Sequence, residues 1–137
     1  MNKSKTTLLL MELVIMVMFF SVAAAICMNV FASAQLTAND SANRSMAGIY
    51  AQSTVDCYKA TKGDLAACAG ILGGFAEENA LYIYFDNKWN LLDSAAGSRD
   101  GFTVWLMKPA SGDILVTVTA NDTGERFFDI RTYILPL

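Results

Sequence analysis

Two cysteines in the middle of the chain are the residues whose type and spacing most directly suggest chemistry. Cys57 and Cys68 lie eleven positions apart, and Gly63 stands between them. Two helices joined by a turn at this glycine could bring the thiols together, and a disulfide closing so short a loop would contribute about 3 kcal/mol. The alternative is two free thiols buried where the helices meet. Cys27 falls in a long apolar run, where a thiol behaves as a small apolar side chain.

Two common signals of catalysis or metal binding are absent from this sequence. It contains no histidine, the commonest general base and metal ligand, and no CxxC pair. The formal net charge is −3, from 10 basic and 13 acidic residues, which argues against a nucleic acid partner. We therefore expect no catalytic residues, no metal site and no cofactor, and we do not expect an enzyme.

Glu12 is the one charged residue in an apolar run that extends from Leu8 to Met28. A carboxylate inside a membrane helix costs about 2.5–3.5 kcal/mol on insertion scales, so it needs a partner or a shallow position. Glu12 lies about one turn into the run, and its side chain could reach the headgroups near Lys5. The other interpretation gives the carboxylate a partner in another chain.

The apolar run around Glu12 predicts a helix that crosses a membrane. Its 21 residues would extend about 31 Å as a helix, at roughly 1.5 Å per residue, which matches a hydrocarbon core of about 30 Å. Lys3 and Lys5 precede it without an acidic residue, so the positive-inside rule makes residues 1–7 a cytoplasmic basic leader. We expect a single membrane-spanning helix over residues 8–34, in contact with lipid, and an extracytoplasmic domain over residues 35–137.

A secretory signal peptide is an alternative to an anchor that stays in the membrane. The tripeptide Ala32-Ser33-Ala34 is an acceptable small-residue cleavage site. However, the apolar run is longer than the roughly 7–15 residues typical of a signal peptide, and Glu12 is unusual in such a region. The sequence therefore favours the anchor.

The segment from Lys5 to Ile15, Lys-Thr-Thr-Leu-Leu-Leu-Met-Glu-Leu-Val-Ile, resembles the N-terminus of type IV pilins and of the pseudopilins of type II secretion and competence systems. In that family a short basic leader precedes a cleavage point, four mostly apolar residues, a glutamate and a long apolar helix. Placing Glu12 on the family glutamate makes Leu8 the first mature residue. Thr7, where the family has glycine or occasionally alanine, becomes the last leader residue. The resemblance implies cleavage by a prepilin peptidase, with Glu12 neutralising the N-terminal amine of a neighbouring subunit.

Residues 36–61 predict one amphipathic helix that continues the anchor. Its moderately apolar stripe combines a seven-residue repeat with neighbouring positions: Leu36, Asn43, Tyr50 and Cys57, with Met46, Ala47 and Ile49. The opposite face is polar and carries Asp40, Arg44 and Gln52. Gly48 is expected to weaken this helix by roughly 1 kcal/mol relative to alanine.

From Asp64 onward the sequence predicts a short second helix and then a sheet. Asp64 can cap a helix over residues 64–72, which a pair of glycines ends. The period then changes to that of strands separated by short turns, over residues 81–85, 89–92, 102–108, 114–119 and 127–135. This order predicts an antiparallel β-meander over residues 80–135, with one face covered by the amphipathic helix.

The expected fold class is α+β: a long N-terminal helix, first transmembrane and then amphipathic, a short second helix, and the meander packed on the first helix. This order resembles a pilin subunit. The resemblance implies a structural subunit, a minor pilin or pseudopilin-like component of a bacterial type IV pilus, competence or type II secretion-like apparatus. Its partners would be other pilin-like subunits, contacted through the N-terminal helix.

A membrane-tethered extracytoplasmic β-domain that binds a ligand or partner protein, without forming filaments, is the alternative function. Its adhesive surface would come from the aromatic residues of the predicted strands: Tyr82, Tyr84, Trp89 and Trp105. Tryptophan and tyrosine anchor many interfaces. At strand spacing, however, such residues more often belong to the core or to cross-strand pairs.

Overall fold

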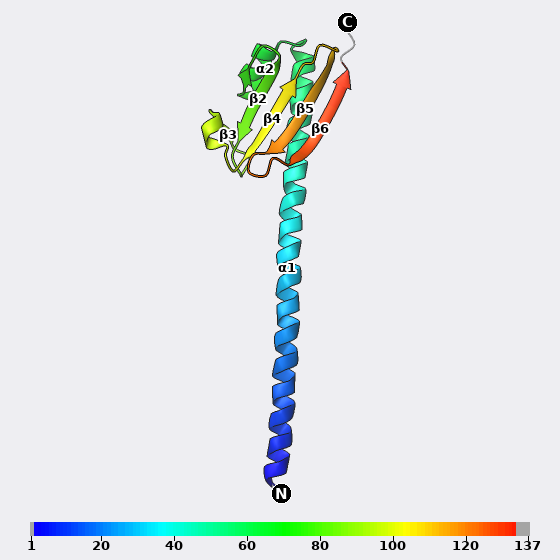
Figure 1. The fold of residues 1–137 in the computed structure, drawn as a ribbon, viewed down its shortest axis with the longest axis vertical. Coiled ribbons are helices and arrows are strands. Elements are labelled where there is room, and N and C mark those ends of the chain that lie inside the picture. The colour runs from blue at the N-terminus through cyan, green and yellow to red at the C-terminus, as the bar shows by residue number, and fades with distance from the viewer. Residues whose placement is uncertain (1, 134–137) are drawn as a thin grey trace. The chain divides into compact units, whose positions relative to one another are not determined.

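The computed structural model describes residues 2–133, and the chain divides into two compact units, Met1–Ser41 and Ala42–Leu137. One long helix, α1 (Asn2–Ala60), forms the described part of the first unit and continues into the second (Figure 1). The second unit adds one helix, one 3₁₀ turn and six strands: α2 (Leu65–Leu72), β1 (Phe75–Ala76), β2 (Ala80–Phe85), β3 (Leu91–Leu92), η1 (Ala95–Gly97), β4 (Phe102–Met107), β5 (Asp113–Ala120) and β6 (Arg126–Tyr133). The predicted α+β class is confirmed. Residues 134 and 135 of the predicted last strand lie outside the described residues.

Helix α1 has 59 residues and no interruption between the predicted membrane segment and the predicted amphipathic segment. Its most apolar stretch of 18 residues has a mean hydropathy of 2.5, and the side chains of that stretch are not buried. By length and composition, it is the one helix among residues 2–133 that could cross a membrane.

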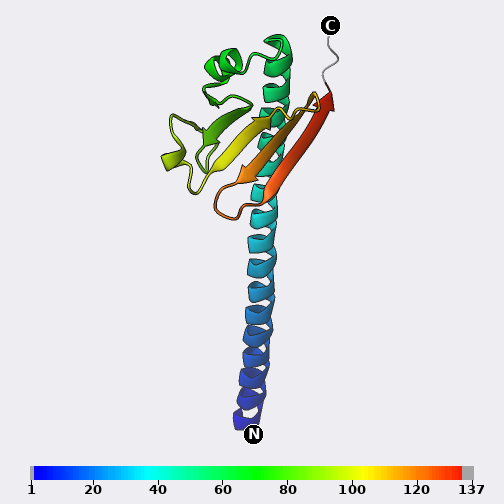
Figure 2. The same cartoon turned by 45° about the horizontal axis from the view of Figure 1, so that its top comes forward.

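The end of α1 is set by the backbone conformation of Lys62 and Gly63. These residues have φ angles of 54° and 87°, a region that glycine adopts without strain. The Gly63 N–H donates to the Tyr58 carbonyl oxygen at 3.0 Å, which satisfies a carbonyl at the helix end. The Asp64 carboxylate then accepts hydrogen bonds from two backbone N–H groups of α2, at 3.1 and 3.2 Å. The predicted Asp64 cap is confirmed, and α2 follows directly on the end of α1 (Figure 2).

The strands form one antiparallel sheet in the order β1-β2-β4-β5-β6, with β3 paired to the end of β2 (Figure 1). Strands β2, β4, β5 and β6 correspond closely to four of the predicted strands. Strand β1 and the 3₁₀ turn η1 were not predicted from the sequence. Both are too short to produce a periodic pattern of their own.

The predicted return strand at 89–92 is confirmed only at its second half. Only Leu91 and Leu92 pair with β2, opposite Phe85 and Tyr84. The Asp86 carboxylate accepts hydrogen bonds from the N–H groups of the second and fourth residues after it, both at 2.8 Å, and so holds residues 86–90 in a turn. Strand β3 is therefore short and shares one edge of β2 with β1, whereas β4 pairs along the whole opposite edge of β2.

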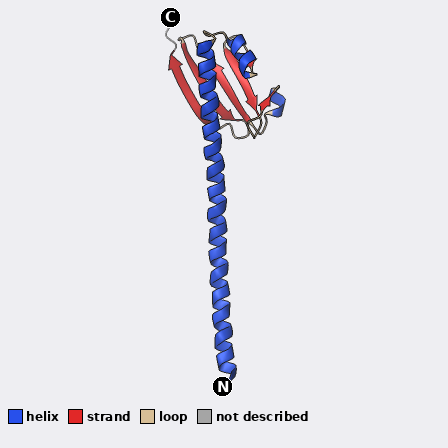
Figure 3. Cartoon of the chain, turned by 180° about the vertical axis from the view of Figure 1, so that it is seen from behind, coloured by secondary structure: helices blue, strands red, loops and turns tan. Residues whose placement is uncertain are grey.

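One face of the sheet packs against residues 42–60 of α1, which belong to the same unit (Figure 3). The strands alternate as predicted and direct a set of buried side chains to this core: Leu81, Ile83, Phe85, Phe102, Val104, Leu106, Ile114, Val116 and Val118. The helix contributes Ala47, Ala51, Thr54, Val55 and Tyr58, each buried. The rings of Tyr50 and Phe85 lie 4.4 Å apart and join the two layers.

The predicted apolar stripe of this helix is partly wrong. Leu36 and Ile49 are 72% and 58% exposed, whereas Ala47 and Ala51 are fully buried. Small side chains let the helix backbone approach the sheet closely, so the alanines occupy the centre of the contact. Larger members of the stripe, such as Tyr50, pack at its margin.

Gly48 offers a test of how tightly this helix packs on the sheet. A Cβ atom at this position would lie 3.6 Å from the ring of Phe128, an ordinary van der Waals distance. We expect Gly48→Ala to raise the free energy of unfolding by about 0.5–1 kcal/mol, because alanine loses less backbone entropy in a helix. Thermal unfolding of the full chain in a mild detergent measures the effect.

Gly101→Ala is the contrasting variant, because a Cβ atom there would lie 1.9 Å from the Phe85 carbonyl oxygen. This substitution is expected to lower the melting temperature. A fall in the melting temperature of Gly48→Ala would show that α1 lies closer to β6 than the structure places it.

Candidate functional site

Glu12 lies in the first unit on α1, and its side chain is exposed. Among residues 2–133 the structure records no hydrogen bond or ion pair for this carboxylate. Large apolar side chains on both sides of it along the helix are also more than half exposed: Leu8, Leu9, Leu10, Met11, Leu13, Val14, Ile15, Met16, Val17, Met18, Phe19 and Phe20. This single helix therefore needs lipid or other helices to cover its apolar surface and to accommodate one negative charge.

The hollows on this helix do not form a ligand site. One of them is lined by side chains that all come from a single stretch of α1: Ile15, Met18, Phe19, Val22, Ala23 and Ile26. Ligand pockets are concave and enclose most of a ligand. A hollow bordered by one helix alone is instead the kind of surface that lipid tails or the ridges of another helix fill.

The candidate processing bond between Thr7 and Leu8 lies inside α1, in its second turn. The Thr7 hydroxyl donates to the Lys3 carbonyl oxygen at 2.7 Å, and the Thr6 hydroxyl donates to the Asn2 carbonyl oxygen at 2.8 Å. These bonds hold the side chains against the preceding turn. Because the bond lies inside the helix, its cleavage requires the first two turns of α1 to unwind. Such unwinding is feasible because helix ends fray.

The face of the sheet opposite α1 carries three of the four predicted adhesive aromatic residues. Tyr82 and Tyr84 of β2 stack with ring centroids 6.4 Å apart, and Trp105 of β4 lies directly across from Tyr82. All three are half-buried. Phe75 and Met107, which the sequence analysis did not single out, are 43% and 39% exposed. We call these five residues the aromatic patch.

Trp89, the fourth predicted adhesive residue, lies in the core instead. Its ring stacks on Phe102 at 4.2 Å with an interplanar angle of 6°, and lies 5.5 Å from the Tyr50 ring. The indole N–H donates to the Asn43 side-chain oxygen at 3.1 Å. This residue serves the packing of α1 on the sheet and is not available to a ligand.

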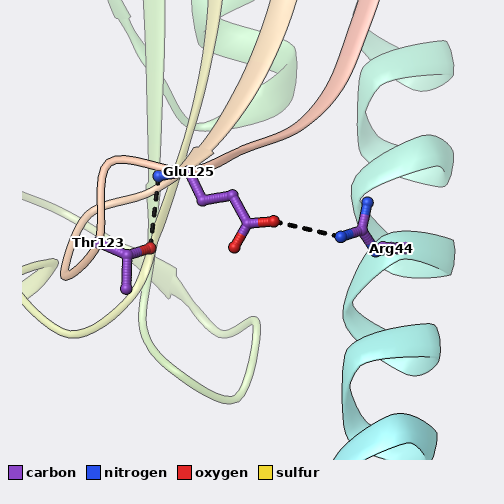
Figure 4. A network of polar contacts seen from close by, with 3 residues as sticks. All are labelled: Arg44, Thr123 and Glu125. Atoms are coloured by element: carbon purple, nitrogen blue, oxygen red, sulfur yellow. Dashed lines mark hydrogen bonds and ion pairs between the residues drawn. The ribbon is translucent and has the colours of Figure 1, made fainter.

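Arg44, on the predicted polar face of the helix, connects α1 to the β5–β6 turn. Its guanidinium lies 3.2 Å from the Glu125 carboxylate, and the Glu125 N–H donates to the Thr123 hydroxyl at 3.3 Å (Figure 4). The guanidinium also lies 5.4 Å from the centre of the Phe127 ring. Both members of the ion pair are about half exposed, so solvent screening leaves it a small contribution to stability.

Cys57 and Cys68 lie on the two sides of the turn between α1 and α2, and Cys57 packs against the core cluster that contains Cys68. Cys68 is fully buried in α2, Cys57 is half-buried near the end of α1, and both are free thiols. Burial, followed by a hydrogen bond with the Cys57 thiol, raises the pKa of Cys68 to about 12. Cys68 is therefore fully protonated near neutral pH. The predicted disulfide remains a prediction.

The acidic residues on the loops form no metal site. Among the described residues, no group of three or more His, Cys, Asp and Glu side chains could hold a metal ion. The pKa of Asp86 is lowered, chiefly by the hydrogen bond from the Asn90 side chain, and that of Asp113 chiefly by the Ser111 hydroxyl. The Asp86 carboxylate is a partner within its own turn, and that of Asp113 also lies 3.6 Å from the Arg131 guanidinium of β6.

Comparison with protein-family models, curated proteins and solved structures finds no match to this chain. The candidate sites therefore rest on the geometry of the chain. They are an exposed apolar helix with one carboxylate, a pair of thiols in one core cluster, and the aromatic patch on the outer face of the sheet.

Proposed function

We propose that this chain is a minor pilin or pseudopilin-like subunit of a bacterial filament or secretion apparatus. In this proposal α1 anchors the subunit in the membrane, and the same helix packs against those of other subunits during assembly. The position of Glu12 carries the proposal: a single carboxylate near the start of an exposed apolar helix, which continues into an α+β domain.

The exposed apolar side chains of α1 suit both environments that such a subunit must occupy. In the membrane, lipid tails cover them. In a filament, helices of neighbouring subunits cover them instead, and tight packing of side chains between the helices supplies the attraction. No second element of this chain is needed to bury the helix in either state.

The carboxylate gives this packing a register. A buried glutamate without a partner is unfavourable, and so is a buried amine, whereas the two placed together compensate much of each other's desolvation. Cleavage after Thr7 would create an amine at Leu8, four positions before Glu12. In a staggered array, the Glu12 carboxylate of one subunit can meet the Leu8 amine of the next. The pairing would disfavour other staggers, because these leave both charges unpaired.

The intact mass of the protein extracted from membranes tests this proposal. We expect a chain that begins at Leu8, because cleavage there creates the amine, four positions before Glu12, that the proposed pairing between subunits needs. The variant Thr7→Gly is the matched comparison, since it places the preferred residue of the pilin family before the cut. It should be processed at least as completely as the natural chain. A natural chain that begins at Met1 removes the proposed partner of Glu12.

A membrane-tethered binding module is the second candidate function, and the aromatic patch favours it. Tyr82, Tyr84 and Trp105 lie together on the face of the sheet that α1 does not cover, and aromatic side chains of this kind anchor interfaces. This function needs the helix only as an anchor. It therefore predicts that Glu12 substitutions leave activity unchanged and that substitutions at Trp105 impair it.

A further inference from the structure

The two central thiols meet because the turn between α1 and α2 is closely defined. The Thr61 N–H donates to the Cys57 carbonyl oxygen at 2.9 Å, and the Cys68 N–H donates to the Asp64 carbonyl oxygen at 3.1 Å. These bonds place one cysteine in the last turn of α1 and the other in the first turns of α2. Cys57 packs against the core cluster that contains Cys68, and its side chain is one of the causes of the raised pKa of Cys68.

We propose that Cys57 and Cys68 are oxidised to an intramolecular disulfide that fastens α2 to the end of α1. The residues lie in one compact unit, on the two sides of one short turn and in one core cluster, so the bond requires no rearrangement of separate parts of the chain. An oxidising compartment is needed for the disulfide to persist. In this respect the inference rests on the extracytoplasmic orientation of the proposed function.

The oxidant is the disulfide of a thiol–disulfide oxidoreductase, or of oxidised glutathione in vitro. The Cys57 thiolate attacks one sulfur of that disulfide and forms a mixed disulfide, while the other sulfur leaves as a thiolate and takes up a proton. The Cys68 sulfur then attacks the sulfur of Cys57, loses its proton and releases the second thiol. In the net reaction, the two cysteines lose two electrons and two protons, and the oxidant is reduced to two thiols.

The order of these two steps follows from the exposure of the thiols. Cys68 is fully buried, and it remains protonated near neutral pH, so an external disulfide cannot reach a thiolate there. Cys57 is half-buried and accessible. Cys57 is therefore the attacking residue, and Cys68 is the resolving residue that completes the bond from within the core.

The disulfide compensates for a weak point of the fold. Helix α2 has eight residues, which is too short to be stable without tertiary contacts, and Ile71 on it is 69% exposed. A covalent link to α1 restricts the unfolded chain and holds α2 in place. For a loop of this length and a domain of this size, we expect the melting temperature to rise by about 10 °C on oxidation.

Incubation of the full chain with oxidised glutathione in a mild detergent tests the pair directly. All proteins carry Cys27→Ser, which removes the thiol of the apolar helix. We expect the parent chain to lose two hydrogens by intact mass and to melt at a higher temperature. The variant Cys68→Ser should stop at one glutathionyl adduct on Cys57, whereas Cys57→Ser should remain unmodified. A parent chain that keeps two free thiols, or an adduct on Cys68 in the second variant, would overturn the proposal.

Trapping the natural chain in cells with acid, followed by alkylation, tests whether the bond forms where the protein resides. One alkylated cysteine, Cys27, is the expected result, and three after reduction. Three alkylated cysteines before reduction would overturn oxidation in the cell. Together with successful oxidation by glutathione, that result would contradict the orientation of the domain and not the geometry of the pair. Processing at Leu8 is measured separately, so it can fail while the disulfide stands.

Discussion

The variant Glu12→Ala is expected to insert into the membrane at least as well as the natural chain and to fail in assembly. Removing the carboxylate relieves an insertion cost of about 2.5–3.5 kcal/mol. In an assembled array, the same change leaves the neighbouring amine buried without its partner, which costs about 3–5 kcal/mol. Such a penalty lowers incorporation at each step by roughly 10²–10⁴-fold. Quantifying the subunit in membrane fractions and in sheared filament fractions measures both effects.

Two further variants separate loss of charge from general disturbance of α1. Glu12→Gln keeps the size and polarity of the side chain but not its charge, so it should fail in assembly nearly as completely as alanine. Ser21→Ala is the matched control in the same exposed helix, since it removes only a hydroxyl that donates to the Val17 carbonyl oxygen at 2.8 Å. It should assemble normally. Normal assembly of both Glu12 variants would refute the proposed register and leave the tethered module as the better account.

Much of the fold could be predicted because its signals are local. Lys62 and Gly63 end α1, and Asp64 caps the start of α2. Each of these residues acts on backbone groups within one helical turn of its own position. The alternation in β2, β4 and β5 is just as local, because one face of each strand is buried throughout.

The errors occurred where residues distant in the sequence decide the outcome. The predicted helix stripe included Ala47 but also the exposed Ile49, and it missed Ala51, because the position of the sheet decides which side chains lie at the contact. Trp89 begins a segment, residues 89–92, whose composition is typical of a strand. It nevertheless adopts a φ of 64° in the turn, because its ring finds a site on Phe102 that only β4 can provide. No periodic pattern in the sequence encodes these two choices.

The candidate sites show the same difference between local signals, which could be predicted, and contacts between distant residues, which could not. The thiol pair could be predicted because a capped turn fixes both cysteines within eleven positions. The aromatic patch was predicted incompletely, because Phe75 joins it only through a two-residue strand that pairs with Tyr82. The contact of Arg44 with Phe127 depends on a register shift between Val118 and Thr119 in β5. No pattern in the sequence predicts this shift.

Among the substitutions that we describe, Trp89→Ala is expected to destabilise the domain most. The indole ring lies among the rings of Phe102, Tyr50 and Phe85, at 4.2, 5.5 and 5.6 Å, and its removal leaves a cavity at the centre of this cluster. Truncation of a buried tryptophan costs about 3–5 kcal/mol. For a domain of roughly 100 residues, this corresponds to a fall in melting temperature of more than about 12 °C.

Trp105→Ala is the matched control, because it removes the same side chain from the outer face of the sheet, where the ring is half-buried. It should lower the melting temperature by less than half as much. Trp89→Phe should fall between the two, since it keeps a stacked ring and loses the hydrogen bond to Asn43. Alkylation of the buried Cys68 thiol during heating, under reducing conditions, reports unfolding without relying on either tryptophan. Greater destabilisation by Trp105→Ala than by Trp89→Ala would mean that the outer face, and not the cluster beneath α1, holds the domain together.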